Sequence, residues 1–394
     1  MKILYNLKIF FLFILFQSNT LISQMPVCGN EFFYDCTTTL RFDRKINKYL
    51  KFQRNEISQR SDIYINIVFH IVYEKDVSNV TDKAILQEVR ILNNAFNSKN
   101  ADISKVPYEF KDAINNGGIN FCIASINSDE GIKIGIERRK TEISQIGIKD
   151  NLYHTYKGGL TAWNTDKYLN IWIADTGNNI RGYGTYPRQV PKEKEGIVIS
   201  PKYFGENNSR RYNMGKTLIH EIGHYLGLKH IWGDKIGCEF DDLVSDTPDQ
   251  EHRYIGCPDY PVKSCNSNDM FMNYMDYVDD ECMYMFTEGQ MERMKATIMI
   301  YRKELIQNSM CENMVITPKN DFRVFPNPTS QYIIIDFDSS ILEIGEIIIL
   351  DNLGQKIYNV KTYIYNKKKI DVSFLSKGIY FIGIGKVYNK FIVK

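Results

Sequence analysis

The chain has 394 residues, of which 43% are hydrophobic and 24% charged, and its formal net charge is +2. A net charge this close to zero gives no electrostatic reason to expect binding to nucleic acid or to an acidic membrane surface. The length predicts two or three domains, with the composition of an ordinary soluble globular protein.

The first 24 residues have the pattern of a secretory signal peptide. Lys2 and Lys8 give a basic start, and Ile9 to Phe16 is an unbroken apolar run of eight residues. That run is far shorter than the roughly 20 residues needed to span a bilayer. We therefore expect an exported protein with no transmembrane span in its mature form, whose eight cysteines meet an oxidising compartment.

Residues 25–60 are predicted to be a pro-segment. They contain Cys28 followed by glycine, then Cys36, then a basic run from Arg41 to Arg60 with few apolar residues. A thiolate is a good zinc ligand, so Cys28 can occupy an open zinc position and keep an enzyme latent. A local disulfide between Cys28 and Cys36 is the alternative, and both interpretations stay open.

Residues 61–310 are predicted to form an α+β domain with an upper mixed α/β half and an irregular, disulfide-stapled lower half. Residues 63–73 are β-branched and aromatic, which predicts a strand with His70 packed in the core. Thr81 is a candidate cap for a helix whose apolar residues recur at helical spacing, namely Ile85, Val89, Leu92 and Phe96. Further strands are expected over 119–124, 169–173 and 196–200, the last as an exposed edge able to pair with an extended peptide.

The central motif is the stretch from His220 to His230, which reads His-Glu-Ile-Gly-His-Tyr-Leu-Gly-Leu-Lys-His. On a helix, His220 and His224 share one face, roughly 5–6 Å apart at Cβ, and two neutral imidazoles form half of a zinc site. Gly227 ends the helix, because glycine adopts the left-handed conformation without steric cost. His230 can then return as the third ligand, leaving one position open for water, which is typical of a catalytic zinc site.

Glu221 is the candidate general base, placed to reach a metal-bound water rather than the metal. A bare His-Glu-x-x-His pattern occurs by accident, but the added glycine and third histidine make a chance match on the order of one in 10⁵. An amphipathic core helix is the alternative, since Leu218, Ile222 and Tyr225 recur at helical spacing. That apolar stripe does not explain three histidines and a glutamate on the remaining faces.

Beyond His230 the sequence loses its periodicity and gains cysteine and acidic residues. Four cysteines fall here, Cys238, Cys257, Cys265 and Cys282, and they allow three pairings. The acidic stretch Asp241, Asp242, Ser245, Asp246 and Thr247 offers hard oxygen ligands suited to calcium. A solvated acidic turn is the alternative for that stretch.

The extended zinc motif and a later methionine resemble the metzincin clan, and the surrounding blocks resemble its pappalysin family. These blocks are His230-x-Trp232-Gly233-Asp234, Asp246-Thr247-Pro248, Asn273 to Tyr277, and Phe286-Thr287-Glu288-Gly289-Gln290. Several independent blocks occur in the family's order, and the resemblance spans roughly residues 63–302.

The resemblance implies roles for three residues after the zinc motif. Met275 would lie in a turn beneath the zinc as a hydrophobic floor for the imidazoles. Tyr277 would direct its hydroxyl to the zinc and steady the tetrahedral oxyanion. The position of Glu281 carries an acidic residue in relatives that select Arg or Lys after the scissile bond, although Glu is longer than Asp.

The resemblance also implies disulfides, a structural calcium ion and a latent precursor. The implied pairs are Cys238 with Cys265 and Cys257 with Cys282. The implied calcium ligands are Asp242, Ser245 and Thr247. Latency through a Cys-Gly near the N-terminus occurs in the family and favours the zinc-switch interpretation of Cys28. This leaves Cys122 and Cys311, which either pair or, for Cys122, form a buried thiol.

Residues 311–320 are predicted to be a linker, and residues 321–394 a small all-β sandwich. Strands are expected over 332–337, 346–350, 355–360, 379–384 and 390–393. By itself this pattern is typical of a carbohydrate-binding or adhesion module that stays on the protein. However, the blocks Phe325 to Thr329, Leu350 to Gly354, Leu375 to Tyr380 and the basic end Lys390 to Lys394 resemble a type IX secretion sorting domain. That resemblance implies passage through the periplasm and release outside the cell or retention at its surface.

Together these features predict a secreted zinc endopeptidase that hydrolyses peptide bonds in proteins, with Glu221 taking a proton from the zinc-bound water. One catalytic Zn²⁺, a structural Ca²⁺, protein or peptide substrates, the type IX secretion machinery as partner, and a monomeric state are expected. The alternative is a cell-surface binding or adhesion protein with a non-catalytic zinc site. The intact Glu221 and Tyr277 favour the enzyme, since a binding protein needs neither.

Overall fold

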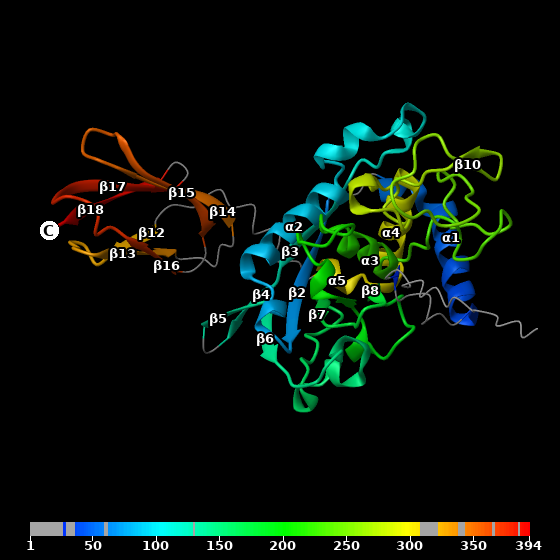
Figure 1. Cartoon of the computed structure of the whole chain (residues 1–394), viewed down its shortest axis with the longest axis horizontal. Helices are drawn as coiled ribbons and strands as arrows, with labels where there is room; N and C mark the ends of the chain where they lie inside the picture. The colour runs from blue at the N-terminus through cyan, green and yellow to red at the C-terminus, as the bar shows by residue number, and fades with distance from the viewer. Residues whose placement is uncertain are drawn as a thin grey trace, which may run out of the picture.

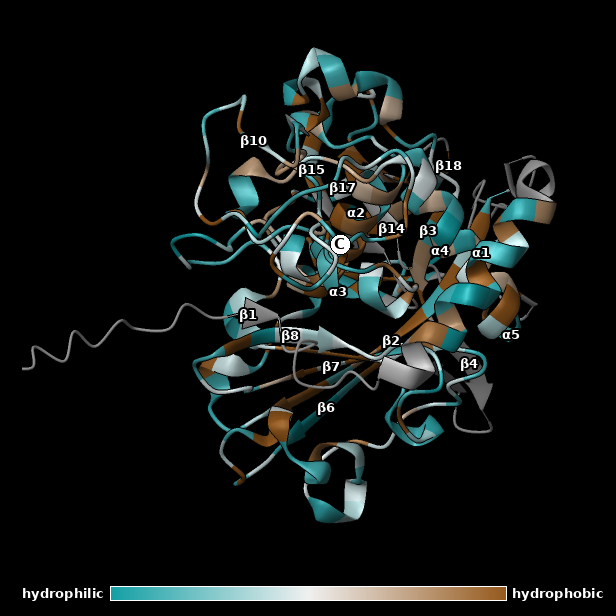
Figure 2. Cartoon of the chain, turned by 90° about the vertical axis from the view of Figure 1, so that its right-hand side faces the viewer, coloured by the Kyte–Doolittle hydropathy of each residue, from teal (hydrophilic) through white to brown (hydrophobic). Residues whose placement is uncertain are grey.

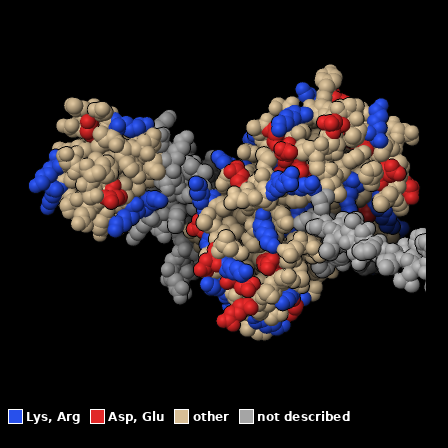
Figure 3. Space-filling model, in the orientation of Figure 1, with Lys and Arg blue, Asp and Glu red and all other residues tan. Residues whose placement is uncertain are grey.

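The computed structural model describes residues 27–28, 36–58, 62–128, 131–307, 322–337, 343–364, 367–384 and 387–394. The predicted signal peptide and the predicted linker lie outside these residues. Among the described residues, no helix combines the length and the apolar character needed to cross a membrane. On the face drawn in Figure 3, lysine and arginine are interspersed with aspartate and glutamate, as the small net charge implies.

The N-terminal unit is built on one seven-stranded mixed sheet with the order β1-β8-β9-β7-β2-β3, and β6 also pairs with β2 (Figure 1). Its strands are β1 Val27–Cys28, β2 Ile63–Tyr73, β3 Ile119–Ile123, β6 Ile136–Lys140, β7 Leu169–Ala174, β8 Ile180–Gly184 and β9 Ile197–Ile199. Two small hairpins lie outside it, β4 Ser125–Ser128 with β5 Gly131–Ile134 and β10 Lys263–Ser264 with β11 Ser267–Asn268.

Strand β2 is the centre of this sheet. It pairs in parallel with β3, β6 and β7. Nearly all its residues are buried, so both of its faces are covered. A strand buried on both sides is expected to be almost continuously apolar, and Figure 2 shows β2 coloured largely as hydrophobic. The predicted strands over 63–73, 119–124, 169–173 and 196–200 are confirmed to within a residue or two.

Helix α2, Asp82–Phe96, covers the sheet as its periodicity predicts. The Thr81 side chain accepts a hydrogen bond from the Ala84 N–H at 3.3 Å, which confirms the predicted cap. Ile85, Leu92 and Phe96 are fully buried in the main core. The upper half of the unit is therefore a mixed α/β layer arrangement, as predicted.

The predicted exposed edge at residues 196–200 is wrong. Strand β9 lies inside the sheet, parallel to β7 and antiparallel to β8. Strand β8, which the sequence analysis did not identify, is the strand toward that edge, and among the described residues only the two-residue β1 pairs with its outer side. Strand order depends on long-range pairing, which the local sequence of residues 196–200 does not encode.

Helix α1, Cys36–Ser58, lies within the predicted pro-segment and was not expected to be a helix. Phe42 and Ile46 are buried and α1 packs against α4. Asp43 forms an ion pair with the fully buried Arg293 and a second one with Lys229 at 3.1 Å. Two apolar residues and one buried carboxylate are enough to attach this polar helix to the unit.

The lower half is largely irregular and leads into helix α4. Helix α3, Lys216–Tyr225, precedes it, and α4, Glu288–Tyr301, begins with a capping box formed by Thr287 and Gln290. The short α5, Glu304–Gln307, follows. Single 3₁₀ turns supply most other helical residues. The irregular path between α3 and α4 is consistent with the loss of periodicity that the sequence shows there.

The C-terminal strands form two sheets around a core of their own. Strands β12 Phe322–Phe325, β13 Tyr332–Phe337 and β16 Lys367–Asp371 make one sheet, and β14 Glu343–Leu350, β15 Lys356–Ile364, β17 Gly378–Ile384 and β18 Val387–Val393 make the other. Side chains of both sheets share one hydrophobic cluster that includes Ile333, Ile347 and Phe391. The five predicted strands are present, while β12 and β16 were missed.

Candidate metal centre and substrate cleft

Helix α3 positions the first two histidines, and all of its residues are buried. Its N-terminus is capped by Asp280, whose Oδ2 accepts the N–H groups of Met214 at 2.8 Å and Lys216 at 3.2 Å. A carboxylate is favourable here because it satisfies free N–H groups at the positive end of the helix. At the other end Gly227 adopts a φ of +89°, the left-handed turn predicted from the sequence.

The turn after α3 brings the third histidine back to the first two. The Nε2 atoms of His220 and His224 are 3.1 Å apart, as are those of His224 and His230. All three rings are buried and offer ligand atoms to a single point. Two nitrogens on a tetrahedral zinc at 2.0–2.1 Å would be separated by about 3.3 Å, so the spacing fits this metal.

Each imidazole is oriented by a hydrogen bond at its other nitrogen. The Nδ1 atom lies 2.7 Å from the Tyr274 carbonyl in His220 and 2.9 Å from the Leu228 carbonyl in His224. In His230, Nδ1 lies 2.6 Å from Asp234 Oδ1. A protonated Nδ1 leaves the Nε2 lone pair free to bind a metal ion, and such partners fix the ring orientation.

Burial lowers the pKa of His220 and His224 and so favours their neutral form. It lowers the pKa of His224 to about 3, and the neighbouring His230 ring adds to that effect. Burial is also the main cause that holds the pKa of His220 well below its ordinary value. Neutral rings are the form that binds zinc. The chemistry of this donor set, three buried nitrogen lone pairs converging on one point, therefore fits a zinc ion.

Glu221 lies beside His220 on α3 and is only 1% exposed. Strand β8 crosses directly over it, because β8 has glycine at the contact positions. A Cβ added at Gly182 would lie 3.2 Å from Glu221 Cγ, and one added at Gly184 would lie 2.4 Å from the Glu221 carbonyl oxygen. Any larger residue at these positions would push the strand away from the helix, so β8 packs directly against α3 at Glu221.

The segment that carries Met275 and Tyr277 packs beneath and beside the three histidines. Met275 is fully buried, and a Cβ added at Gly223 would lie 2.5 Å from its sulfur, so Met275 packs directly beneath α3. The ring centroid of Tyr277 lies 4.9 Å from that of His230 and 5.7 Å from that of His220. The structure thus brings together both residues that the resemblance singled out near the histidines.

Two contacts at the third histidine were not anticipated. The Trp232 ring stacks on His230 with centroids 4.4 Å apart and planes 6° from parallel, and Asp234 binds His230 Nδ1. Trp232 and Asp234 both belong to the block His230-x-Trp232-Gly233-Asp234, in which only His230 was predicted to have a role. An acidic residue four positions after a ligand histidine was the available signal for an orienting carboxylate.

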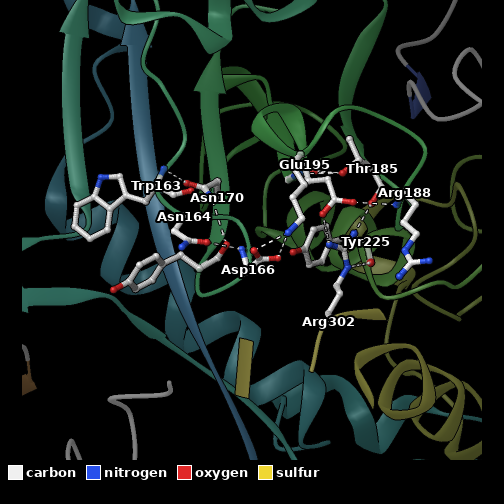
Figure 4. A network of polar contacts seen from close by, with 12 residues as sticks. Trp163, Asn164, Asp166, Asn170, Thr185, Arg188, Glu195, Tyr225 and Arg302 are labelled. Carbon is white, nitrogen blue, oxygen red and sulfur yellow. Dashed lines mark hydrogen bonds and ion pairs between the residues drawn. The ribbon is translucent and has the colours of Figure 1, made fainter. Parts of the chain in front are cut away.

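A buried arginine links α3, β8 and the loop from β8 to β9 (Figure 4). Arg302 donates to the Tyr225 carbonyl at 3.2 Å and to the Thr185 carbonyl at 3.1 Å, and it pairs with Glu195 at 3.1 Å. The other oxygen of Glu195 accepts the Arg188 N–H at 2.9 Å. These bonds hold the end of α3, the end of β8 and the loop from β8 to β9 in fixed relative positions.

Both implied disulfides are present in the irregular half. They are Cys238–Cys265 and Cys257–Cys282, with Cα–Cα distances of 5.4 and 5.7 Å. Cys122 is also disulfide-bonded, so the buried-thiol alternative is wrong. The two bridges are interleaved in the chain and cross-link the irregular region between α3 and α4, which has little regular secondary structure.

The remaining candidate residues lie in different surroundings. Asp242 is buried; its Oδ1 accepts hydrogen bonds from Val244 N–H and Thr247, while its Oδ2 has no hydrogen-bond partner. Ser245 is exposed. Glu281 is exposed with Oε1 beside Cys257 at 3.4 Å, so it does not line a buried pocket. The backbone of Cys28 pairs with that of Gly182, and its side chain lies outside the described structure.

Comparison with known families gives two matches along the chain. Residues 151–299 match the peptidase family model described as pregnancy-associated plasma protein-A. Residues 323–394 match the model of the secretion system C-terminal sorting domain. The first match contains all three histidines and Tyr277, and the second covers nearly all of the C-terminal strands.

Individual relatives agree with these matches. An extracellular metalloprotease of Arthroderma gypseum is 27% identical over 244 residues, which are 60% of this chain and 72% of the relative. Mature mirolysin of Tannerella forsythia, solved in complex with a cleaved peptide, is 36% identical with a TM-score of 0.58, covering 63% of this chain and 99% of that one. A promirolysin mutant from the same organism is 34% identical with a TM-score of 0.62, covering 71% of this chain and 96% of that one.

Proposed function

The chain belongs to the pappalysin family of zinc metallopeptidases, and from that premise we propose that it is a secreted endopeptidase that uses Glu221 as general base. His220, His224 and His230 would hold the zinc ion, as their converging Nε2 atoms indicate. When bound, zinc polarises the peptide carbonyl and lowers the pKa of water at the site to about 7.

The chain's own residues supply the remaining chemistry. Glu221 takes a proton from the attacking water and later passes it to the leaving amine. Burial between α3 and β8 keeps solvent away from its carboxylate. Tyr277 donates a hydrogen bond to the oxyanion as the tetrahedral intermediate forms, a type of contact worth about 10²–10³-fold in rate. Met275 and Trp232 pack against the imidazole site and keep the rings in place.

The substrate backbone is proposed to pair with β8. This strand borders the cleft at Glu221, and among the described residues its outer side is paired only by β1. Extended peptides bind such strands through main-chain hydrogen bonds, which act on any sequence. The proposal moves the expected peptide-binding edge from residues 196–200 to residues 180–184.

The proposal depends most on the arrangement of the three histidines. Each buried imidazole has a hydrogen-bond partner at Nδ1, and its Nε2 points to a place shared with the other two, beside the buried Glu221. The test is cleavage of a protein substrate by the secreted, matured enzyme before and after treatment with a chelator. We expect cleavage to stop and to return when zinc is restored. Cleavage that survives complete removal of metal would exclude the proposed mechanism.

We propose a structural calcium ion at Asp242, Ser245 and Thr247. The supporting observation is Oδ2 of Asp242, which is buried without a hydrogen-bond partner, because a buried carboxylate oxygen needs a counter-charge or a proton. Burial raises the pKa of Asp242 well above its ordinary value. A calcium-dependent rise in melting temperature that is absent in Asp242→Asn would support this site.

Latency of the precursor is proposed to depend on Cys28. Its backbone pairs with Gly182, and Gly182 packs on Glu221, so this strand residue lies next to the proposed catalytic position. Removing the thiol in Cys28→Ala should make the precursor active before processing. Equal latency of the mutant and wild-type precursors would exclude the zinc switch.

Selection of Arg or Lys after the scissile bond is the last part of the proposal, and it depends on Glu281. Since this side chain is exposed, we propose that Glu281 attracts basic residues at the outer rim of the cleft. The proposed order of segments is signal peptide 1–24, pro-segment 25–60, protease domain 61–310, linker 311–320 and sorting domain 321–394. The last of these directs export through the periplasm to the cell exterior.

A further inference from the structure

A buried glutamate on helix α2 makes no hydrogen bond with its carboxylate. Glu88 is fully buried, and neither of its carboxylate oxygens has a hydrogen-bond partner among the described residues. Helix α2 packs against α3, and Oε2 of Glu88 is directed at the start of α3, since a Cβ added at Gly215 would lie 2.3 Å from it. Burying an ionised carboxylate without a partner is costly, so Glu88 requires either a ligand or a proton.

A second buried carboxylate faces the same first turn of α3. Asp280 is 1% exposed, and its Oδ2 accepts the N–H groups of Met214 and Lys216. These two residues flank Gly215, the residue against which Glu88 packs. In the described part of the chain, Oδ1 of Asp280 makes no hydrogen bond. Three of the four carboxylate oxygens that converge here from α2 and from the irregular region therefore have no partner.

A third carboxylate belongs to the loop that leads into α3. The backbone of Glu206 forms an antiparallel bridge with Met214, which closes the base of the loop over residues 205–215. Burial raises the pKa of Glu88 well above its ordinary value, and the negative charges of Asp280 and Glu206 raise it further. Glu206 is exposed, so this acidic group has two members in the interior and one side in solvent.

The cations near this acidic group do not bond to the unpartnered oxygens. Lys216 forms an ion pair with Asp102 and donates to the Met283 carbonyl at 2.6 Å. Lys216 and Arg181 both lower the pKa of Asp280, but burial, the largest cause, still raises it. The described residues therefore give Oδ1 of Asp280 no hydrogen-bonded counter-charge.

A proton alone satisfies too few of these oxygens. A protonated carboxyl has one O–H donor, so a hydrogen bond from Glu88 to Asp280 would still leave one of the three buried oxygens without a partner. A divalent cation binds several oxygens at once. Calcium takes 6–8 oxygen ligands, binds carboxylates through one or both oxygens, and keeps water on its open side. A donor set made only of oxygens favours calcium over zinc.

We propose that Glu88, Asp280 and Glu206 form a binding site for a divalent cation, calcium in particular, at the N-terminus of α3. Glu88 contributes both oxygens, Asp280 contributes Oδ1, and Glu206 with water completes the coordination from the solvent side. The ion connects α2, the loop over 205–215 and the irregular region, and so fixes the start of α3. The site shares no residue with the calcium site proposed at Asp242, and it does not depend on the proposed proteolysis.

The test is calcium binding by the matured protein that carries Asp242→Asn, which removes a ligand of the other proposed calcium site. Isothermal titration with Ca²⁺, with zinc held at one equivalent, should show one binding event with a Kd between about 10⁻⁵ and 10⁻³ M. Adding Glu88→Gln should weaken binding at least about tenfold, since even residues that only orient metal ligands contribute that much. The calcium-dependent rise in melting temperature should disappear with it.

Asp82→Asn is the matched control, because it removes an exposed carboxylate from the same helix. It should leave the calcium affinity of the Asp242→Asn protein unchanged, which separates a ligand from general electrostatic attraction. Glu206→Gln should weaken calcium binding less than Glu88→Gln, because Glu206 is exposed. It also tests the site if Glu88→Gln does not fold.

Two results would overturn the inference. The Asp242→Asn protein could bind no calcium, which would show that a proton or water satisfies Glu88. Alternatively, calcium could bind the folded Glu88→Gln variant with unchanged affinity or, where that variant does not fold, the Glu206→Gln variant, which would place the ion elsewhere.

Discussion

Two buried histidine environments in this protein differ in what faces the second ring nitrogen. In the central sheet, Nε2 of the fully buried His70 lies 2.8 Å from Asn170 Oδ1, and its Nδ1 makes no hydrogen bond but lies 3.0 Å from the Glu137 carboxylate. The ring also stacks on Trp172. Around α3, each of His220, His224 and His230 has an oxygen acceptor beside Nδ1, and its Nε2 faces only the other histidines.

The difference separates a structural histidine from a metal ligand. A buried polar group without a partner is destabilising. The second nitrogen of His70 faces a carboxylate, whereas the free nitrogens of the other three histidines face one another and leave room for a cation between them. What faces the second nitrogen is therefore more informative than burial, which is complete or nearly so at both places.

The largest effect is expected for Glu221→Ala. Loss of the general base should lower kcat/KM by at least about 10³-fold, while zinc stays bound, because Glu221 is not a ligand in this account. Steady-state cleavage and metal analysis measure the two quantities. The matched change at the other histidine, Glu137→Ala, should leave the activity of the folded enzyme unchanged. An active Glu221→Ala enzyme would contradict the assignment.

A smaller loss is expected for Tyr277→Phe. Removing the hydroxyl should lower kcat by about 10²-fold with little change in KM, since the bond to the oxyanion exists only in the transition state. Zinc content should remain at the wild-type level. A rise in KM at constant kcat would instead indicate that Tyr277 acts in substrate binding.

His70→Leu should reduce stability and leave the chemistry intact. It removes the buried hydrogen bond to Asn170 and the ring that stacks on Trp172, which should lower the free energy of unfolding by about 1–3 kcal/mol. Urea unfolding followed by fluorescence measures this loss. Zinc content and kcat of the folded fraction should be those of the wild type, and a loss of zinc would refute the distinction between the two environments.

The smallest effect concerns pH. Burial raises the pKa of Asp276 to about 7 although Gln250, Tyr254 and Tyr277 donate to it. Because the folded state binds this proton more tightly than the unfolded state, Asp276 lowers stability as pH rises from about 4 to 7, by less than roughly 1.4 kcal/mol per pH unit.

Asp276→Asn should remove this slope. Unfolding free energies of the variant and the wild type, measured at saturating zinc between pH 5 and 8, isolate the contribution of Asp276 from the titration of other groups. Parallel curves for the two proteins would show that Asp276 stays ionised in the folded state.

Local periodicity made much of this structure predictable. Residues 63–73 are almost continuously apolar and form a strand buried on both faces, and Thr81 with the spacing of Ile85, Leu92 and Phe96 defines α2. The geometry of the zinc motif is also local. The four-residue spacing places His220 and His224 on one face of a helix, and the left-handed Gly227 brings His230 back to them. These features depend on neighbours within a few turns of the chain.

The missed features depend on contacts between distant residues. Helix α1 is polar in sequence. It is attached to the unit by the ion pair between Asp43 and Arg293, which are 250 residues apart. Strand β8 has two glycines where β-branched residues would signal a strand, because it must pass close to Glu221. Arg181 contacts the rings of Tyr212 and Tyr277, which lie on two other segments of the chain. No local sequence pattern predicts these contacts.

The most direct test of the central claim is the zinc content of purified, matured protein, measured for the wild type, His224→Gln and His70→Gln. We predict one zinc per chain in the wild type and in His70→Gln, and loss of that zinc together with proteolysis in His224→Gln. A folded wild-type enzyme that cleaves protein without zinc, or a folded His224→Gln variant that keeps both its zinc and its activity, would contradict the account.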